Sequence, residues 1–304
     1  MGGRSAPTAH LGLDLGGTFI KWAVVERRSG GWQALDRGRV DTPVGPDAVV
    51  HRLSEVGREA FAKWPGVNTV GIGVPGLYDP ATGATRMLPN LPGEWHESPV
   101  AVRVGEALGL PVHMINDARA FGVAELRLGA ARGADCMVGL TLGTGVGGVV
   151  AVNGHVHQGH DGTAGELGHQ TIVPDGLACT CGNRGCLEAY TKADRIEELC
   201  GAATAEEAVA RARAGDQRAL DGIAEIARYL GIGIANMIVV LTPDMVVLGG
   251  GISAAADLLL DPIRDEVLRR VHTTAVDEVD IVTAELGTWA GAIGAAVHGA
   301  ESVA

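Results

Sequence analysis

The sequence predicts an α/β fold made of two related halves. Short apolar runs with the length of buried strands alternate along the chain with segments in which apolar residues recur at helical spacing. A strand that runs into a turn of glycine and threonine occurs twice, at Leu13–Thr18 and at Leu140–Gly145. The sequence contains no linker rich in proline and serine, so we expect the two halves to pack closely around a cleft.

The first half begins with two strands, expected at 10–15 and 19–25, joined by a tight turn at Gly16 and Gly17 that glycine accepts readily. A helix is expected from Asp47, a candidate N-cap, because the apolar residues after it repeat with a helical period. The other elements expected in this half are strands at 32–40, 70–74 and 112–115 and helices at 100–108 and 118–128.

The second half repeats this opening. The turn Gly143-Thr144-Gly145 follows a strand that ends at Leu142, a second strand is expected at 148–152, and Asn153-Gly154 indicates a hairpin after it. The remaining elements expected are a long helix at 220–240, a strand at 245–248, a turn at Gly249–Gly251, a helix from Ala254, a strand near Ile281 and a terminal helix from Trp289.

Composition excludes several classes of protein. The chain has 304 residues, 46% of them hydrophobic, which is enough for one large domain or two medium ones. A net charge of −12 argues against nucleic-acid binding, because binding phosphate backbones requires a basic face. No apolar run approaches the roughly 20 residues that span a bilayer, and the first ten residues lack a signal-peptide core. We therefore expect a cytoplasmic protein.

The most specific motif is a cluster of thiols. Cys179, Cys181 and Cys186 lie within a glycine-rich stretch, and His169 precedes them. Three thiolates and one imidazole are a complete ligand set for a structural zinc ion, with no open position for a catalytic water. His157 or His160 could replace His169 as the fourth ligand. Cys136 and Cys200 are expected to be buried, unreactive thiols.

The other motifs each have a structural and a functional interpretation. The segment Asp14–Thr18 is either an ordinary hairpin turn or a phosphate-binding turn, in which backbone N–H groups approach phosphate oxygens. Asp117 either caps a helix or serves as a general base at the end of a strand. The glycines at 249–251 form either a flexible turn or a flat surface for a purine. Glu166 and Glu188 are either solvated charges or acceptors for sugar hydroxyls, and their position around the metal loop favours the second interpretation.

Taken together, these motifs resemble those of the ROK sugar kinases, the bacterial glucokinase-like family of the actin/hexokinase superfamily. The resemblance runs from about Leu11 to about Gly294. The segments that carry it are Asp14–Thr18, Pro89-Asn90-Leu91, Asn116-Asp117-Ala118, Leu142–Gly148, Gly165–His169, Cys179–Glu188 and Val247–Gly251. Members of the family often have a third glycine after the pair Gly147-Gly148, where this chain has Val149. This position lies past the phosphate turn, so we expect the difference to have a small effect on phosphate binding.

The resemblance implies an α/β, two-lobed actin/hexokinase-like (ribonuclease H-like) fold with a central cleft. The expected lobes are a small one at 1–117, on which a C-terminal helix at about 289–304 packs, and a large one at 118–288. The large lobe would carry a zinc-bound loop at 165–188.

The resemblance also implies a function, which is ATP-dependent phosphorylation of a hexose at its 6-hydroxyl, with glucose as the first candidate. Asp117 would be the catalytic base. The sugar would be bound by Asn90, Asn116, Asp117, Glu166, His169 and Glu188. ATP with Mg²⁺ would be bound by Asp14, Gly16, Gly17, Thr18, Lys21, Thr144, Gly145, Gly249, Gly250 and Gly251. A structural Zn²⁺ would be held by His169, Cys179, Cys181 and Cys186, so His169 would serve both metal and sugar.

Several alternatives remain open. The sugar could be N-acetylmannosamine, N-acetylglucosamine, fructose, allose or a cyclitol. A sugar-responsive repressor is less expected, because the phosphate motif begins at Asp14 and leaves no room before it for a DNA-binding domain. A zinc hydrolase would need an open coordination site, and polyphosphate-dependent relatives generally lack the cysteines. The family commonly forms homodimers and sometimes homotetramers.

Overall fold

The computed structural model describes residues 8–89 and 91–303, and the described chain divides into two compact units. The first unit comprises the chain up to Arg132, Gln158–Thr163 and the chain from Leu286 onward. The second unit comprises Gly133–His157 and Ala164–Glu285.

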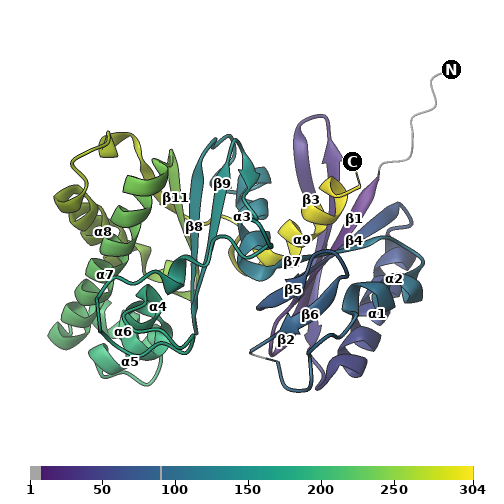
Figure 1. Cartoon of the computed structure of the whole chain (residues 1–304), viewed down its shortest axis with the longest axis horizontal. Coiled ribbons are helices and arrows are strands. Elements are labelled where there is room, and N and C mark those ends of the chain that lie inside the picture. Colours follow the sequence, from purple (N-terminus) through teal and green to yellow (C-terminus); the bar gives the residue numbers. More distant parts are fainter. Residues whose placement is uncertain (1–7, 90, 304) are drawn as a thin grey trace. The chain divides into compact units, whose positions relative to one another are not determined.

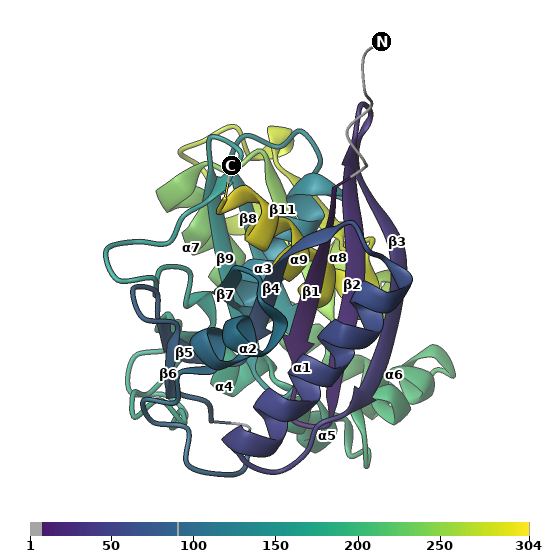
Figure 2. The ribbon, with the colours of Figure 1, turned by 90° about the vertical axis from the view of Figure 1, so that its right-hand side faces the viewer.

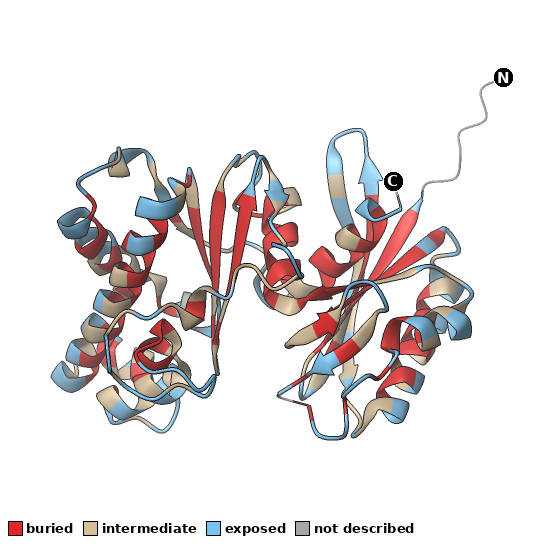
Figure 3. Ribbon diagram, in the orientation of Figure 1, coloured by how far each residue is buried: buried red, intermediate tan, exposed pale blue. Residues whose placement is uncertain are grey.

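The first unit is built on a mixed sheet that is buried at its centre and exposed at one edge (Figures 1 and 3). Among the described residues its five strands have the order β3-β2-β1-β4-β7. β1 pairs antiparallel with β2 and parallel with β4, and β4 pairs parallel with β7. The strands are β1 (Ala9–Leu15), β2 (Phe19–Arg28), β3 (Gly31–Asp41), β4 (Val67–Val74) and β7 (Val112–Asn116).

Helices cover both faces of this sheet (Figure 2). The pair α1 and α2 lies on one face and α9 on the other, where α3 packs against α9. The helices are α1 (Pro46–Lys63), α2 (Val100–Leu108), α3 (Asp117–Arg127) and α9 (Ala290–Glu301). Because α3 packs with α9, the first unit extends to Arg132 and does not end at residue 117.

The second unit repeats the topology of the first. Its five described strands have the order β10-β9-β8-β11-β12, with the same sequence of antiparallel and parallel pairings. This equivalence confirms two related α/β halves. The strands are β8 (Met137–Leu142), β9 (Val146–Val152), β10 (His155–Val156), β11 (Met245–Gly250) and β12 (Asp280–Thr283). β9 and β10 form the hairpin expected at Asn153-Gly154.

The core of the second unit lies between its sheet and α7, which packs against α5, α6 and α8. By length and composition α7 could cross a membrane, contrary to the expectation that no segment is apolar enough, but 56% of its most apolar window is buried within the protein. The helices are η1 (Leu167–His169), α4 (Leu187–Thr191), α5 (Ala193–Cys200), α6 (Ala205–Arg213), α7 (Gln217–Leu241), η2 (Gly251–Ala255), α8 (Ala256–Arg270) and η3 (Val276–Glu278).

Most predicted elements form, and the differences lie at helix starts and in short elements. Asp47 lies in the first turn of α1, whose N-cap is Gly45. Gly249 and Gly250 belong to β11, so the turn expected there begins only at Gly251. The sequence analysis missed the hairpin of β5 (Leu77–Asp79) and β6 (Ala84–Met87) and the helices α4, α5 and α6. The short η4 (Gly287–Trp289) leads into α9.

Helix α9 approaches its sheet so closely that only glycine fits between them. A Cβ atom added at Gly71 of β4 would lie 1.7 Å from the carbonyl oxygen of Ala295, and one at Gly12 of β1 would lie 1.8 Å from that of Ala292. These contacts are with backbone atoms, which cannot move aside as a side chain can.

We therefore expect Gly71→Ala to destabilise the protein by about 3 kcal/mol, because the added methyl group must push α9 away from β4. Urea unfolding followed by circular dichroism measures this loss. Gly30→Ala is the matched control, since a Cβ at Gly30 meets no atom within 4 Å. Equal stability of the two variants would contradict the close-packing argument.

Candidate functional site

The first predicted phosphate turn connects β1 to β2, and Thr42 braces it. The Thr42 hydroxyl donates a hydrogen bond to the carbonyl oxygen of Gly16 (2.7 Å), and the Thr42 N–H donates to the carbonyl oxygen of Thr18 (2.9 Å). Sequence reasoning missed Thr42, because it lies just after β3, and it becomes a neighbour of the turn only through strand pairing.

Asp14 and Lys21 face each other across the β1–β2 pair, with Lys21 Nζ 3.7 Å from Asp14 Oδ2. Burial raises the pKa of Asp14, and the Lys21 ammonium partly offsets this increase. The pair therefore places a largely buried carboxylate and a cation beside the turn.

Asn116 and Asp117 have distinct positions at the start of α3. Asn116 is the N-cap, and its Oδ1 atom accepts hydrogen bonds from Ala118 N–H (3.0 Å) and Arg119 N–H (3.3 Å). Its amide donates to the carbonyl oxygen of Gly76 (3.2 Å). The structural interpretation that made Asp117 the cap is therefore wrong, and Asp117 is the first helical residue. Its carboxylate accepts a hydrogen bond from Ala118 N–H at 2.8 Å, at the carboxyl end of β7. Asn90 lies outside the described residues.

The second predicted phosphate turn connects β8 to β9 and contacts Glu188. The Gly143 N–H donates to the carbonyl oxygen of Gly145 (2.9 Å), which closes the turn. Val146 N–H donates to Glu188 Oε2 (2.9 Å), so the carboxylate lies against the turn. A Cβ atom at Gly145 would lie 2.7 Å from the same oxygen, so a larger residue there would require the Glu188 side chain to shift.

The structure brings the four predicted metal ligands together. The ligand atoms of His169, Cys179, Cys181 and Cys186 all lie within 4.8 Å of one another. Cys179 Sγ is 3.7 Å from His169 Nδ1, and Cys181 Sγ is 3.7 Å from Cys186 Sγ. Burial raises the pKa of Cys186 to about 12, whereas the backbone N–H of Asn183 lowers the pKa of Cys181. Metal binding would therefore displace thiol protons.

The cluster also gathers the predicted sugar-binding carboxylates of the second unit. Glu188 Oε1 lies 3.7 Å from Cys179 Sγ, and Glu166 is the N-cap of η1, the short helix that ends at His169. Because His169 turns Nδ1 toward the sulfurs, Nε2 lies at the opposite edge of the ring. Among the described histidines, His169 joins the sulfurs, whereas the alternatives His157 and His160 do not.

A cavity of about 450 Å³ in the second unit borders the phosphate turn. Gly143, Thr144 and Gly251 line it, so the structure places the second turn and part of the predicted nucleoside surface around one space. Gly250 does not line this cavity, and a Cβ there would lie 2.3 Å from the carbonyl oxygen of Leu142. The rest of the wall is mainly apolar and comes from α5, α6, α7 and the start of α8.

Arg213 braces this cavity and was missed in the sequence. Its guanidinium donates to both carboxylate oxygens of Asp257 (2.7 and 3.0 Å) and to the carbonyl oxygen of Ala254 (2.6 Å). These bonds join the end of α6 to the start of α8. A single arginine in a helix is not distinguished by the sequence from a surface residue. Only its place in the cavity wall shows that Arg213 joins α6 to α8 there.

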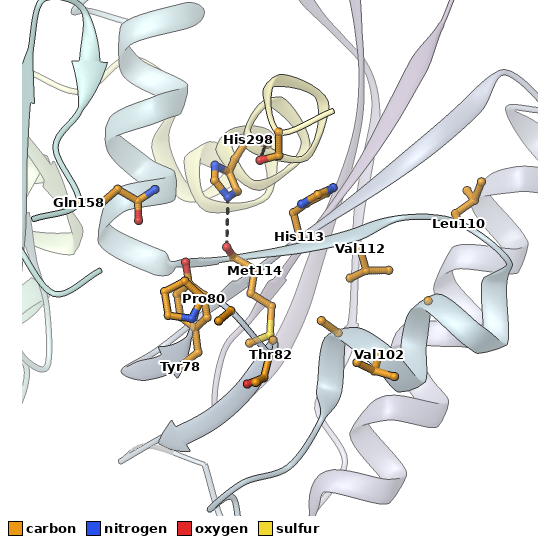
Figure 4. Close-up of a pocket in the computed structure, with 15 residues that line it drawn as sticks. Tyr78, Pro80, Thr82, Val102, Leu110, Val112, His113, Met114, Gln158 and His298 are labelled. Carbon is orange, nitrogen blue, oxygen red and sulfur yellow. Dashed lines mark hydrogen bonds between the residues drawn. The ribbon is translucent and has the colours of Figure 1, made fainter. Parts of the chain in front are cut away.

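A second cavity, of about 650 Å³, lies within the first unit, between β7, α2 and the end of α9 (Figure 4). None of the predicted site residues lines it. His298 Nε2 donates a hydrogen bond to the carbonyl oxygen of Met114 (3.1 Å), and His113 lies nearby. Burial lowers the pKa of both imidazoles, so both are neutral at pH 7.

Comparison with known proteins places this geometry in a family context. The model of the ROK family matches residues 10–300. The chain is 36% identical to a glucokinase of Thermotoga maritima, over 94% of this chain and 95% of that protein. A ROK hexokinase from Thermus thermophilus superposes with a TM-score of 0.84 at 35% identity, covering 97% of this chain and 99% of that one. A ROK family glucokinase from Streptomyces griseus in complex with glucose and AMPPNP superposes with a TM-score of 0.80 at 32% identity, covering 96% and 99%.

The neutral His298 makes the stability of the protein depend on pH. Its folded pKa is lowered, so the unfolded chain binds the proton more readily, and stability falls as the pH drops below the unfolded pKa of about 6.5. We expect His298→Gln, which keeps an N–H donor for Met114, to reduce the stability difference between pH 7.5 and pH 5.5. Urea unfolding at both pH values measures it. Replacing the exposed His51 by Gln should leave the difference as in the parent, and an unchanged difference in His298→Gln would contradict the argument.

Proposed function

The chain belongs to the ROK family, and from this premise we propose that it is an ATP-dependent hexose kinase that phosphorylates the 6-hydroxyl of glucose. Cytoplasmic location and a homodimeric or homotetrameric state belong to the same proposal. The sequence identity of about one third to glucokinases, over nearly the full length of both chains, supports the substrate class.

One observation carries the proposal. The turn Gly143–Gly145 borders the 450 Å³ cavity and also contacts Glu188 beside the cysteine cluster. A nucleoside in the cavity would direct its phosphates to the turn, and the turn adjoins the side chains proposed to bind sugar. Phosphoryl transfer requires this juxtaposition of donor and acceptor, because its catalysis consists mainly of positioning and charge stabilisation.

Asp117 is the proposed catalytic base, which takes the proton of the 6-hydroxyl as the oxygen attacks the γ-phosphorus. Its place at the carboxyl end of β7 suits this role, since sites in α/β folds lie at these strand ends. The hydrogen bond from Ala118 N–H orients the carboxylate. The N-cap Asn116 supports the sugar site by holding the start of α3, and Asn90 completes the proposed sugar set.

Glu166, His169 and Glu188 would accept or donate hydrogen bonds to the sugar hydroxyls. His169 suits a double role, because Nδ1 faces the sulfurs and Nε2 lies on the other edge of the ring. Other hexoses, their N-acetylamino derivatives and cyclitols differ from glucose at one or two carbons, so they are the alternatives to test.

The cysteine cluster fits a structural Zn²⁺. Zinc–sulfur bonds of about 2.3 Å in a tetrahedron separate two sulfurs by about 3.8 Å, and Cys181 Sγ and Cys186 Sγ are 3.7 Å apart. His169, Cys179, Cys181 and Cys186 would fill all four positions, so the ion would fix the loop and supply no catalytic water.

Asp14 fits a role beside Mg²⁺, because a buried carboxylate oxygen is a ligand type that this ion accepts, directly or through water. When bound, Mg²⁺ would neutralise charge on the phosphates of ATP. The residues proposed to bind these phosphates are Gly16, Gly17, Thr18, Lys21, Thr144 and Gly145. Gly249, Gly250 and Gly251 would shape the nucleoside side, where Gly251 lines the cavity.

Mixing the protein with ATP, Mg²⁺ and a panel of sugars, and following the release of ADP, tests the function. We expect glucose-dependent ADP release and a fall in kcat of about a thousandfold in Asp117→Ala, with sugar binding retained, because the base is lost and the pocket is not. Asp47→Ala is the control, since Asp47 also lies in the first turn of a helix of the same unit but is exposed. If no sugar promotes ADP release, the kinase function is wrong, and turnover that survives in Asp117→Ala would rule out Asp117 as the base.

The metal proposal is tested by Cys181→Ser. Removing one of four ligands should weaken zinc binding about 100-fold, lower the melting temperature and raise the KM for sugar. Metal content by mass spectrometry, thermal unfolding and steady-state kinetics measure the three effects. Cys136→Ser is the control, because Cys136 lies outside the cluster. A zinc-free protein with unchanged stability and sugar KM would show that the metal does not hold this site.

A further inference from the structure

The second phosphate turn is held at both ends by the segment that follows the metal-binding loop. At one end, the carbonyl oxygen of Gly143 accepts a hydrogen bond from Ala193 N–H at the start of α5 (2.9 Å). At the other end, Val146 N–H donates to Glu188 Oε2 in α4 (2.9 Å). Helix α4 begins directly after the metal ligand Cys186, so the support of the turn starts at the cluster.

Glu188 uses its second oxygen on the metal-binding loop itself. Oε1 lies 3.7 Å from Cys179 Sγ and 3.4 Å from the hydroxyl of Thr180. One carboxylate therefore connects the loop, through Oε1, to the phosphate turn, through Oε2.

The two sides of this connection are in close contact with the turn. The 2.7 Å distance from the Cβ position of Gly145 to Glu188 Oε2 means that the turn and the carboxylate are in direct contact. The helix that carries His169 presses on the same turn, because a Cβ at Gly168 would lie 2.1 Å from the carbonyl oxygen of Val146. Closely packed groups transmit a displacement, since no void absorbs it.

The loop, by contrast, has little apolar support of its own. Thr180 and Cys181 are exposed, and Leu177 retains 40% of its accessible surface. Its backbone is joined by a few local hydrogen bonds, such as Cys179 N–H to the carbonyl oxygen of Asn183 (2.9 Å). A bound metal would therefore add order to this exposed part of the loop.

We propose that Glu188 is a positioning residue that couples the cysteine cluster to the phosphate turn, so that occupancy of the metal site sets the affinity of the protein for the nucleotide. The proposal rests on the proposed kinase function. It extends the role of the metal from the sugar side of the site to the nucleotide side, and it gives Glu188 a task that does not require sugar.

The test is nucleotide binding in the absence of sugar. Isothermal titration calorimetry with a non-hydrolysable ATP analogue and Mg²⁺ would compare the zinc-loaded and zinc-stripped parent with the loaded and stripped Glu188→Ala variant. We expect stripping to weaken binding about tenfold in the parent and Glu188→Ala to weaken it about as much. Stripping should then change the affinity of Glu188→Ala less than about twofold, because the connection is already broken. Glu188→Gln should recover most of the affinity, since its carbonyl can still accept the Val146 N–H.

A second pair of variants keeps the metal in place, which matters if stripping unfolds the loop further. Thr180→Val removes the hydroxyl that contacts Glu188 and should weaken nucleotide binding about threefold at unchanged zinc content. Thr171→Val is the matched control, because its hydroxyl bonds to Asn183 beside the same loop and does not contact Glu188. In hydrogen exchange, stripping should also deprotect the peptide that contains Val146.

The outcomes separate the two proposals. A parent protein that binds no nucleotide overturns the kinase function and this inference with it. Three other results would overturn the coupling alone. The first is a parent protein that binds nucleotide with the same affinity before and after stripping. The others are effects of stripping and of Glu188→Ala on affinity that simply multiply, and equal effects of Thr180→Val and Thr171→Val.

Discussion

The close approach of a carboxylate to a glycine, which has no Cβ atom, is a constraint on the predicted site residues of each unit. At Gly145 the carboxylate of Glu188 occupies the space that a side chain would need, and at Gly291 the carboxylate of Asp14 does the same, 2.6 Å from the Cβ position. A carboxylate that the sequence places in the predicted site thus lies directly against backbone in each unit. Such contacts fix the direction of the carboxylate without a dedicated hydrogen-bond partner on every side.

The two units share one sheet topology but hold their turns differently. In the first unit, the side chain and backbone of Thr42, which directly follows β3, bind the turn. In the second unit, the turn is bound by Glu188 and by the start of α5, both of which follow the cysteine cluster. The first turn is therefore held by a residue next to its own sheet, whereas the second is held by α4 and the start of α5, whose buried residues include Leu187 and Ile196.

How much the sequence predicts depends on whether the signal is local. The strands, the long helices, the repeated turn and the four metal ligands are visible because each rests on period, spacing or residue type within a short window. The sequence offers Asp117 as one candidate cap of α3, and the structure gives this role to Asn116, since both side chains are good caps and only the hydrogen bonds distinguish them. The sequence does not predict the contacts of Thr42, Arg213 and Glu188 with the turns and the cavity wall. The residues to which they bond are 26, 44 and 42 positions away in the chain.

A metal is a physically suitable support for this loop because the alternatives conflict with its task. A hydrophobic core would require apolar side chains where Glu166, His169 and Glu188 must present polar groups, and burying those groups without partners is costly. Disulfides would constrain the loop but are rare in reducing compartments. Four ligands around one ion would order the segment from 169 to 186 at a single point and would leave the intervening and flanking polar side chains exposed. The loop ordered in this way would support a turn on one side while its carboxylates remained available to a ligand, which a purely apolar packing of the same length could not do.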